Sequence, residues 1–374
     1  MLKDQIKNLT YDQNTLTIEW GDHHQSRFPA NWLRDNAPEN RHASGQKLTD
    51  SAAISLDTAI KMVTVDHHKV RIEWADDSTV SEFEPTWLRA NALEPVEVES
   101  RRWRPSLWTA TDMAVRPEFI FPQLTRQTDA LRAMLTAVRD VGFAVIHDVP
   151  TESEALFKVV DLFGYVRETN YGRYFDVKVT PNPTNLAFTG LTLSGHTDNP
   201  YRDPVPSLQL LHVLHNSVAG GDSTLADGFC VAEALRREAP DKFELLATTP
   251  VTFRYRSADT DLQHESTSIE TDMRGEVRGI RVNNRSMQPF YLPPAQMAAF
   301  YAAYQTFGQM LESDIYKITF KLGAGDLILF DNQRILHGRI GYTGSGERHL
   351  QGCYADRDSL LSKLAVLSRD QTNG

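Results

Sequence analysis

The chain has few cysteines, no long apolar run and no excess of basic residues, and each shortage argues against a class of protein. Its only cysteines, Cys230 and Cys353, are too few for a disulfide scaffold and are typical of a reducing compartment. No apolar run approaches the roughly 20 residues that a membrane-spanning helix needs. Acidic residues outnumber lysine and arginine by 49 to 39, which argues against a nucleic-acid partner. The first residues carry charge and lack an apolar signal core, so we expect a cytoplasmic protein.

Tryptophan is missing from most of the chain, and its distribution divides the sequence. All six tryptophans lie within the first 108 residues. The same stretch holds an internal repeat, in which an alternating strand pattern is followed by a short Trp-Leu-Arg segment. The two copies run from Trp20 to Trp32-Leu33-Arg34 and from Trp74 to Trp87-Leu88-Arg89. We therefore predict a β-rich N-terminal domain over 1–108 and a second domain over 109–374.

The second domain shows helix and strand patterns, with strands prevailing. Helical spacing of apolar residues predicts a helix near 131–138 and a second over about 294–312, and residues 110–125 look like a connector. The second helix would carry an apolar stripe of Met297, Phe300, Tyr301, Tyr304 and Met310. Buried strands are expected at four apolar or alternating runs: 141–146, 207–213, 316–320 and 327–330. Two small sheets that face each other, with helices outside, would satisfy these patterns. The predicted fold class is α+β, mainly β, with a double-stranded β-helix (jelly roll) in the second domain.

One short motif in the second domain suggests a metal site. In His196-Thr197-Asp198 the imidazole and the carboxylate are two residues apart, so on an extended segment they point the same way. His337 would supply a third ligand from a distant strand. Two histidines and one carboxylate on one side of a metal leave the other side open, and this ligand set suits non-haem Fe(II). The H-x-D pair alone has little weight, because 12 histidines and 49 acidic residues produce it often by chance.

Arg348 makes the metal interpretation more specific. It lies 11 residues after His337. Its guanidinium can bind the far carboxylate of 2-oxoglutarate with two hydrogen bonds while the keto-acid end chelates the iron. The four residues in this order predict an enzyme that uses Fe(II), 2-oxoglutarate and O₂. The competing interpretation is a solvated His–Asp pair and a surface arginine.

Several longer motifs resemble a known family. They are Trp32-Leu33-Arg34-Asp35-Asn36, Gly220-Gly221-Asp222-Ser223, Asp331-Asn332 before Leu336-His337-Gly338-Arg339, and Arg348-His349-Leu350. On these motifs nearly the whole chain resembles the γ-butyrobetaine hydroxylase branch of the taurine dioxygenase superfamily. The resemblance implies that His196, Asp198 and His337 bind Fe(II). It also implies that Arg348 binds the C5 carboxylate of 2-oxoglutarate, together with a hydroxyl of Ser223 or Thr224.

The resemblance further implies an aromatic cage for a trimethylammonium group. A quaternary ammonium has no N–H to donate, so aromatic faces recognise it through cation–π attraction and close packing. The positions that match the cage of the family are Tyr171, Phe175, Phe188 and Tyr354.

The anionic end of the substrate is less clearly defined. The resemblance implies amide donors at Asn185 and Asn284. The chain adds Asn199, where the animal enzymes carry tyrosine, and Arg173, Arg202 and Arg285 nearby. A phosphonate, with three oxygens and up to two charges, would use this surplus of donors. The alternative is that the first two arginines pair on the rim, Arg173 with Asp176 and Arg202 with Asp203. The expected reaction is hydroxylation of 2-trimethylaminoethylphosphonate at the carbon next to phosphorus, releasing succinate and CO₂. The alternative is hydroxylation of γ-butyrobetaine to L-carnitine.

One departure from the family concerns zinc. Animal members carry a structural zinc on cysteines just after the Trp-Leu-Arg-Asp-Asn segment, whereas the matching residues 37–42 contain no cysteine. We therefore expect no structural zinc, since His42 and Glu39 alone do not form a usual ligand set. A hydroxylase of another substrate, such as a sulfonate or aryloxyacid, and a non-catalytic binding protein remain as alternatives. The expected assembly is a homodimer with a small zwitterionic substrate and no nucleic-acid or membrane partner.

Overall fold

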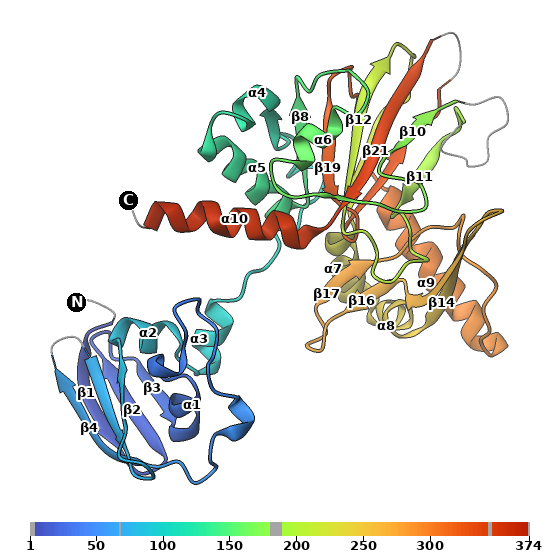
Figure 1. The fold of residues 1–374 in the computed structure, drawn as a ribbon. Helices are drawn as coiled ribbons and strands as arrows, with labels where there is room; N and C mark the ends of the chain where they lie inside the picture. Colours follow the sequence, from blue (N-terminus) through green and yellow to red (C-terminus); the bar gives the residue numbers. More distant parts are fainter. Residues whose placement is uncertain (1–3, 67–68, 180–188, 343–345, 373–374) are drawn as a thin grey trace. The chain divides into compact units, whose positions relative to one another are not determined.

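The computed structural model describes residues 4–66, 69–179, 189–342 and 346–372 (Figure 1). The chain divides into two compact units, Met1–Arg104 and Pro105–Gly374, so the division falls slightly before the boundary expected after residue 108. Within the described ranges, neither unit contains a helix with the length and apolarity needed to cross a membrane.

The N-terminal unit consists of two similar sheet-and-helix elements. The first has antiparallel strands β1 (Ile6–Tyr11), β2 (Thr15–Trp20) and β3 (Gln25–Pro29), followed by α1 (Ala30–Asp35). The second has β4 (Ile60–Asp66), β5 (Lys69–Trp74) and β6 (Val80–Phe83), followed by α2 (Pro85–Ala90). Short 3₁₀ turns at Pro38–Asn40 and Ser51–Ala53 follow α1, and α3 (Pro95–Ser100) follows α2. The predicted repeat is confirmed in these elements.

Arginine and tryptophan side chains connect the two repeats. Trp20 and Trp74 end the middle strands and are fully buried, and each indole N–H donates to a serine hydroxyl of the next strand. The guanidinium of Arg34 in the first repeat lies 5.3 Å from the ring centre of Trp74 in the second. Arg89 lies over Trp20 in the reverse sense, at 5.9 Å. Each Trp-Leu-Arg segment therefore packs on the other copy, with cation–π attraction added to apolar burial.

The C-terminal unit contains two main sheets. The larger comprises β7 (Glu118–Ile120), β8 (Phe143–His147), β9 (Val166–Arg167), β10 (Phe175–Lys178), β12 (Leu208–Asn216), β19 (Leu327–Asp331) and β21 (Arg348–Ala355). The smaller comprises β11 (Leu193–His196), β13 (Ser223–Asp227), β18 (Lys317–Phe320) and β20 (Ile335–Arg339). Their orders are β10-β21-β12-β19-β8-β7, with β9 beside β21, and β11-β20-β13-β18. An apolar cluster joins the two sheets, with Val213 and Phe330 on one side and Leu225 and Phe320 on the other. This packing agrees with the two facing sheets that the jelly-roll prediction requires.

Helices cover the outer faces of both sheets (Figure 1). The first group is α4 (Phe121–Leu124), α5 (Thr128–Val141), α6 (Leu156–Val160) and the C-terminal α10 (Arg357–Thr372). Residues of these helices form one apolar cluster with β8, β12 and β19. The second group is α7 (Gly228–Glu238), α8 (Pro240–Thr248) and α9 (Pro294–Glu312), with the hairpins β14 (Pro250–Arg256)–β15 (Asp261–Thr267) and β16 (Ile269–Thr271)–β17 (Val277–Ile280).

Most predicted elements are confirmed, and two details are corrected. The connector at 110–125 contains β7, which pairs in parallel with β8 and so belongs to the larger sheet. In α9 the buried stripe is Phe300, Ala303, Phe307 and Leu311, whereas Tyr301 is 57% exposed. One residue of rotation on a helix turns a side chain by about 100°, which places Tyr301 outside the stripe.

The metal motif also differs from its expected geometry. The strands β11 and β20, which carry His196 and His337, are antiparallel neighbours in the smaller sheet, and these two residues are directly paired. Asp198 is not on a strand, because β11 ends at His196. Its backbone is instead held by Asn332, which accepts from the N–H of Asp198 at 2.8 Å and donates to its carbonyl at 3.0 Å.

Candidate functional site

A cavity of about 190 Å³ lies between the two sheets of the C-terminal unit. Residues of β10, β12 and β21 line one side, and residues of β11, β13 and β20 line the other. The cavity is larger than the roughly 150 Å³ apolar cavity that admits benzene, so it has room for an organic molecule as well as an ion.

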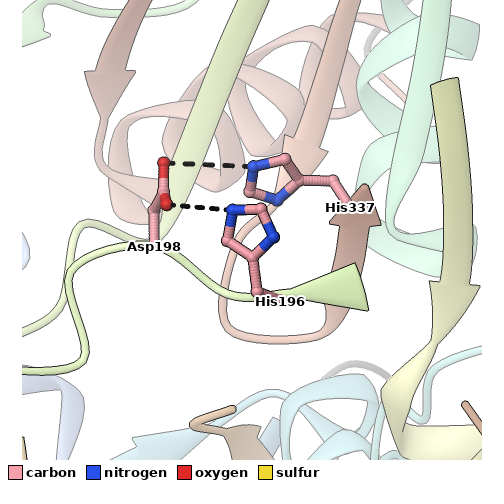
Figure 2. A group of neighbouring side chains, drawn as sticks. All are labelled: His196, Asp198 and His337. Carbon is pink, nitrogen blue, oxygen red and sulfur yellow. Dashed lines mark ion pairs between the residues drawn. The ribbon is translucent and has the colours of Figure 1, made fainter. Parts of the chain in front are cut away.

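His196, Asp198 and His337 converge at this cavity (Figure 2). One ligating atom from each can be chosen so that all lie within 4.8 Å of one another, and this is the only such group in the described part of the chain. Nε2 of His196 lies 3.5 Å from Oδ1 of Asp198, and Nε2 of His337 lies 3.9 Å from Oδ2. The predicted ligand set is thus assembled from a strand pair and the segment that follows β11.

The protonation states of the two imidazoles suit metal binding. Burial lowers the pKa of His337 to about 3, helped by the nearby His196 and opposed by Asp198. His337 is therefore neutral at pH 7 and has a free ring lone pair. Nδ1 of His196 lies 2.9 Å from the carbonyl of Ser194, which can only accept, so Nδ1 carries the proton and Nε2 has the lone pair.

Asp198 is ionised although its side chain is largely shielded from solvent, with 23% exposed. Burial by itself would raise the pKa of Asp198. In the acid range where this carboxylate would take up a proton, attraction to the protonated forms of His196 and His337 and to the guanidinium of Arg285 outweighs burial, so the pKa falls well below its usual range. Its Oδ2 accepts from Nε2 of Gln209 at 2.9 Å and from the hydroxyl of Tyr354 at 3.1 Å. The sequence analysis did not predict that Gln209 and Tyr354 donate hydrogen bonds to Asp198.

A second charged group lines the cavity near Ser223. Burial lowers the pKa of Arg348 to about 10, and repulsion from Arg339 adds to this effect. Its Nε is buried with no hydrogen-bond partner in the described residues, so it is available to an anion. Gly221, at φ +71°, lies close to the stem of Arg348, where an added Cβ would come within 3.4 Å of Cδ. Ser223 lines the cavity, but Thr224 is not among its described lining residues.

Three of the four expected cage residues gather on one side of the cavity. The ring centres of Tyr171 and Phe175 are 5.9 Å apart, and those of Phe175 and Tyr354 are 5.3 Å apart. Phe188, the fourth, lies outside the described residues. The structure adds Tyr201 and Tyr255, whose rings stack at 5.4 Å. No pattern in the sequence marked this pair, because the cavity brings together segments more than 50 residues apart.

The residues expected at the anionic end are only partly brought together. Asn199 and Arg285 line the cavity, and Oδ1 of Asn199 accepts from the Tyr201 hydroxyl at 2.8 Å, which leaves its amide N–H₂ as a donor. Asn284 is exposed, and its Oδ1 accepts from Tyr304 at 2.6 Å. Its neighbours Asn283, Arg285 and Ser286 line the cavity instead. Asn185 lies outside the described residues.

The two arginine pairs proposed as an alternative are not found among the described residues. Arg173 lies over the ring of Phe157, at 4.9 Å, and Arg202 donates to Asn170. Asp176 instead pairs with His349 at 2.7 Å.

In the N-terminal unit, Glu39 accepts a hydrogen bond from Ser81. The absence of a structural zinc there remains a prediction.

Comparison with known proteins agrees with this geometry. Residues 107–354 match the taurine catabolism dioxygenase TauD, TfdA family, and residues 7–89 match the γ-butyrobetaine hydroxylase-like N-terminal family. A γ-butyrobetaine dioxygenase from a Pseudomonas species is 38% identical, over 95% of this chain and 94% of its own. The human γ-butyrobetaine dioxygenase is 32% identical, over 96% of each chain. A trimethyllysine dioxygenase from Meyerozyma guilliermondii is 28% identical, over 97% of this chain and 96% of its own.

Site and comparisons together define the class of protein: it is a dioxygenase that uses Fe(II), 2-oxoglutarate and O₂. The chain belongs to the TauD, TfdA family, in the branch whose members carry a γ-butyrobetaine hydroxylase-like N-terminal domain.

Proposed function

We propose that this dioxygenase hydroxylates a short zwitterion that carries a trimethylammonium group at one end. The observation that carries the proposal is the convergence of the three metal-binding side chains, Arg348 and an aromatic wall on a single cavity. In this proposal His196, Asp198 and His337 hold Fe(II), for which a neutral imidazole, a lone pair on His196 and an ionised carboxylate are suited. Bound iron and 2-oxoglutarate supply the oxidising chemistry, which ends in succinate, CO₂ and a hydroxylated substrate.

The protein's own contribution is binding and orientation. Arg348 with Ser223 would take the C5 carboxylate of 2-oxoglutarate, since the buried guanidinium needs an anionic partner. Tyr171, Phe175 and Tyr354 would hold the trimethylammonium group by cation–π attraction, with Phe188 completing the cage. Fixing both ends of a short zwitterion determines which C–H bond faces the metal, and this proximity accounts for regioselectivity.

γ-Butyrobetaine is the substrate that the named relatives favour, and its product would be L-carnitine. The second candidate is 2-trimethylaminoethylphosphonate, hydroxylated at the carbon next to phosphorus. The observation in favour of the phosphonate is a donor pair at the cavity, namely the free amide N–H₂ of Asn199 and the guanidinium of Arg285. A dianionic phosphonate would use both donors, whereas a carboxylate needs fewer.

The test is a side-by-side assay with each zwitterion, in which succinate and a product heavier by one oxygen are measured. The primary amine 2-aminoethylphosphonate serves as the control for the cage. We expect it to react poorly, because an –NH₃⁺ group would lose water hydrogen bonds on entering an aromatic box. Faster turnover of γ-butyrobetaine supports the carnitine-forming function, and faster turnover of the phosphonate supports the second candidate. Oxidation of the primary amine alone would contradict the proposed cage.

A further inference from the structure

The carboxylate of Asp198 is held from the opposite sheet by two side chains. Gln209 on β12 donates to Oδ2 at 2.9 Å, and Tyr354 on β21 donates to the same oxygen at 3.1 Å. The two donors face each other directly across the antiparallel β12–β21 pair, so their side chains lie on one face and reach one atom. Both donors are almost fully buried, at 1% and 3% exposure.

The direction of both hydrogen bonds follows from the chemistry. An ionised carboxylate only accepts, so the amide N–H₂ of Gln209 must face it and its Oε1 must point away. That Oε1 is buried with no hydrogen-bond partner among the described residues. The hydrogen bond to Asp198 is therefore the interaction that holds the Gln209 amide in place. The hydroxyl of Tyr354 has one O–H to donate, and the carboxylate is the acceptor at 3.1 Å.

We propose that Gln209 and Tyr354 are positioning residues that occupy Oδ2 of Asp198 and leave Oδ1 to bind the iron. With two donors on one oxygen, chelation through both carboxylate oxygens would require breaking these bonds. The inference rests on the proposed role of Asp198 as an iron ligand, but it does not depend on which zwitterion is the substrate.

Tyr354 also connects the metal site to the proposed cage. Its ring packs at 5.3 Å from Phe175 on the aromatic wall, while its hydroxyl contacts the metal-binding carboxylate. A single side chain therefore contacts both the cation site and the ligand. Removing only the hydroxyl separates these two roles, because phenylalanine keeps the ring.

The test measures metal binding directly, by anaerobic calorimetric titration of the metal-free full-length protein with Co(II). We expect Tyr354→Phe and Gln209→Met to weaken Co(II) binding about 10–100-fold, as is usual when an outer partner of a metal ligand is lost. The visible absorption of the bound Co(II) should also change in both variants. Phe175→Leu is the matched control: it removes a cage ring without touching Asp198, so the zwitterion should bind more weakly, with a higher KM, while Co(II) affinity stays within about twofold of wild type.

Asp198→Ala separates failure of this inference from failure of the proposed site. If Asp198→Ala loses Co(II) binding while Tyr354→Phe and Gln209→Met bind as tightly as wild type, the positioning role is refuted and the metal site stands. If Asp198→Ala itself binds Co(II) like wild type, the proposed metal site is wrong. Thermal unfolding of each metal-free variant checks the fold, and Tyr354→Phe decides the question alone if Gln209→Met does not fold.

Discussion

Replacing Arg334 by methionine should destabilise the C-terminal unit strongly, although this residue does not line the cavity. Arg334 and Asp227 form a buried ion pair, with exposures of 2% and 0%. The guanidinium donates to both carboxylate oxygens, at 3.0 and 2.8 Å, and to the carbonyls of Asp140 and Ser106, at 2.8 and 2.6 Å. Asp227 keeps only backbone donors after the substitution, from Trp108 and Phe229. A buried carboxylate left in this state costs about 3–5 kcal/mol.

The assay is thermal and urea unfolding of Arg334→Met beside Lys158→Met. Lys158 pairs with Glu152 at the surface, where both side chains are more than half exposed, so its loss should cost less than about 1 kcal/mol. At about 2 °C per kcal/mol, Arg334→Met should lower the Tm by roughly 6–10 °C and Lys158→Met by no more than about 2 °C. If the two variants unfold together, the ion pair does not have the stabilising role that we assign to it.

Three further predictions concern charge and packing in the C-terminal unit. Arg348→Met should raise the Michaelis constant for the cosubstrate 2-oxoglutarate by at least about 30-fold, equivalent to about 2 kcal/mol of binding free energy. Arg348→Lys should raise it less, because lysine keeps the charge. An unchanged Michaelis constant in Arg348→Met would contradict the assignment. Burial lowers the pKa of His212 to about 4 in the folded chain, whereas a histidine in the unfolded chain has a pKa of about 6.5. Between these two pH values the unfolded chain binds a proton that the folded chain does not. Stability should therefore fall by about 2 kcal/mol between pH 7 and pH 5, and His212→Phe should lose this part of the pH dependence in urea unfolding. A Cβ at Gly338 would lie 2.6 Å from the carbonyl of Leu193, whereas Gly308 in α9 has open space around it. Gly338→Ala should thus weaken Co(II) binding by separating β11 from β20. Gly308→Ala should raise the free energy of unfolding by up to about 1 kcal/mol. Equal Co(II) affinity in the two variants would refute the steric argument.

The sequence identified the three side chains that converge at the cavity better than it predicted their surroundings. His196, Asp198 and His337 were identifiable because metal chemistry restricts the ligands to a few residue types. Asn332 was visible only as part of a family motif, and its role in holding the backbone of Asp198 became clear from the contacts. Tyr201 and Tyr255 left no local signal, since aromatic residues in a chain with 12 tyrosines are ordinary core residues by default.

Gln209 illustrates a signal that was present but not used. It is a single polar residue in the apolar run Leu208-Gln209-Leu210-Leu211 at the start of β12. A buried amide among apolar neighbours needs a partner, so such a residue points to a nearby polar group. Which group it meets depends on the approach of the segment after β11 to the larger sheet. Asn284 shows the same limit, because one step along the chain separates an exposed amide from Asn283 in the cavity.

The direct pairing of His196 with His337 across β11 and β20 makes metal binding a reporter of strand register. Side chains alternate between the two faces of a strand, so a slip of one residue between these strands would turn one imidazole away from the cavity. A molecule with the wrong register could keep its sheets, its helices and much of its apolar core and still fail to bind iron. The ratio of bound metal to protein in a preparation therefore measures the fraction of correctly paired molecules. It does so even where molecules with the wrong register resist heat and proteases as well as the correct ones.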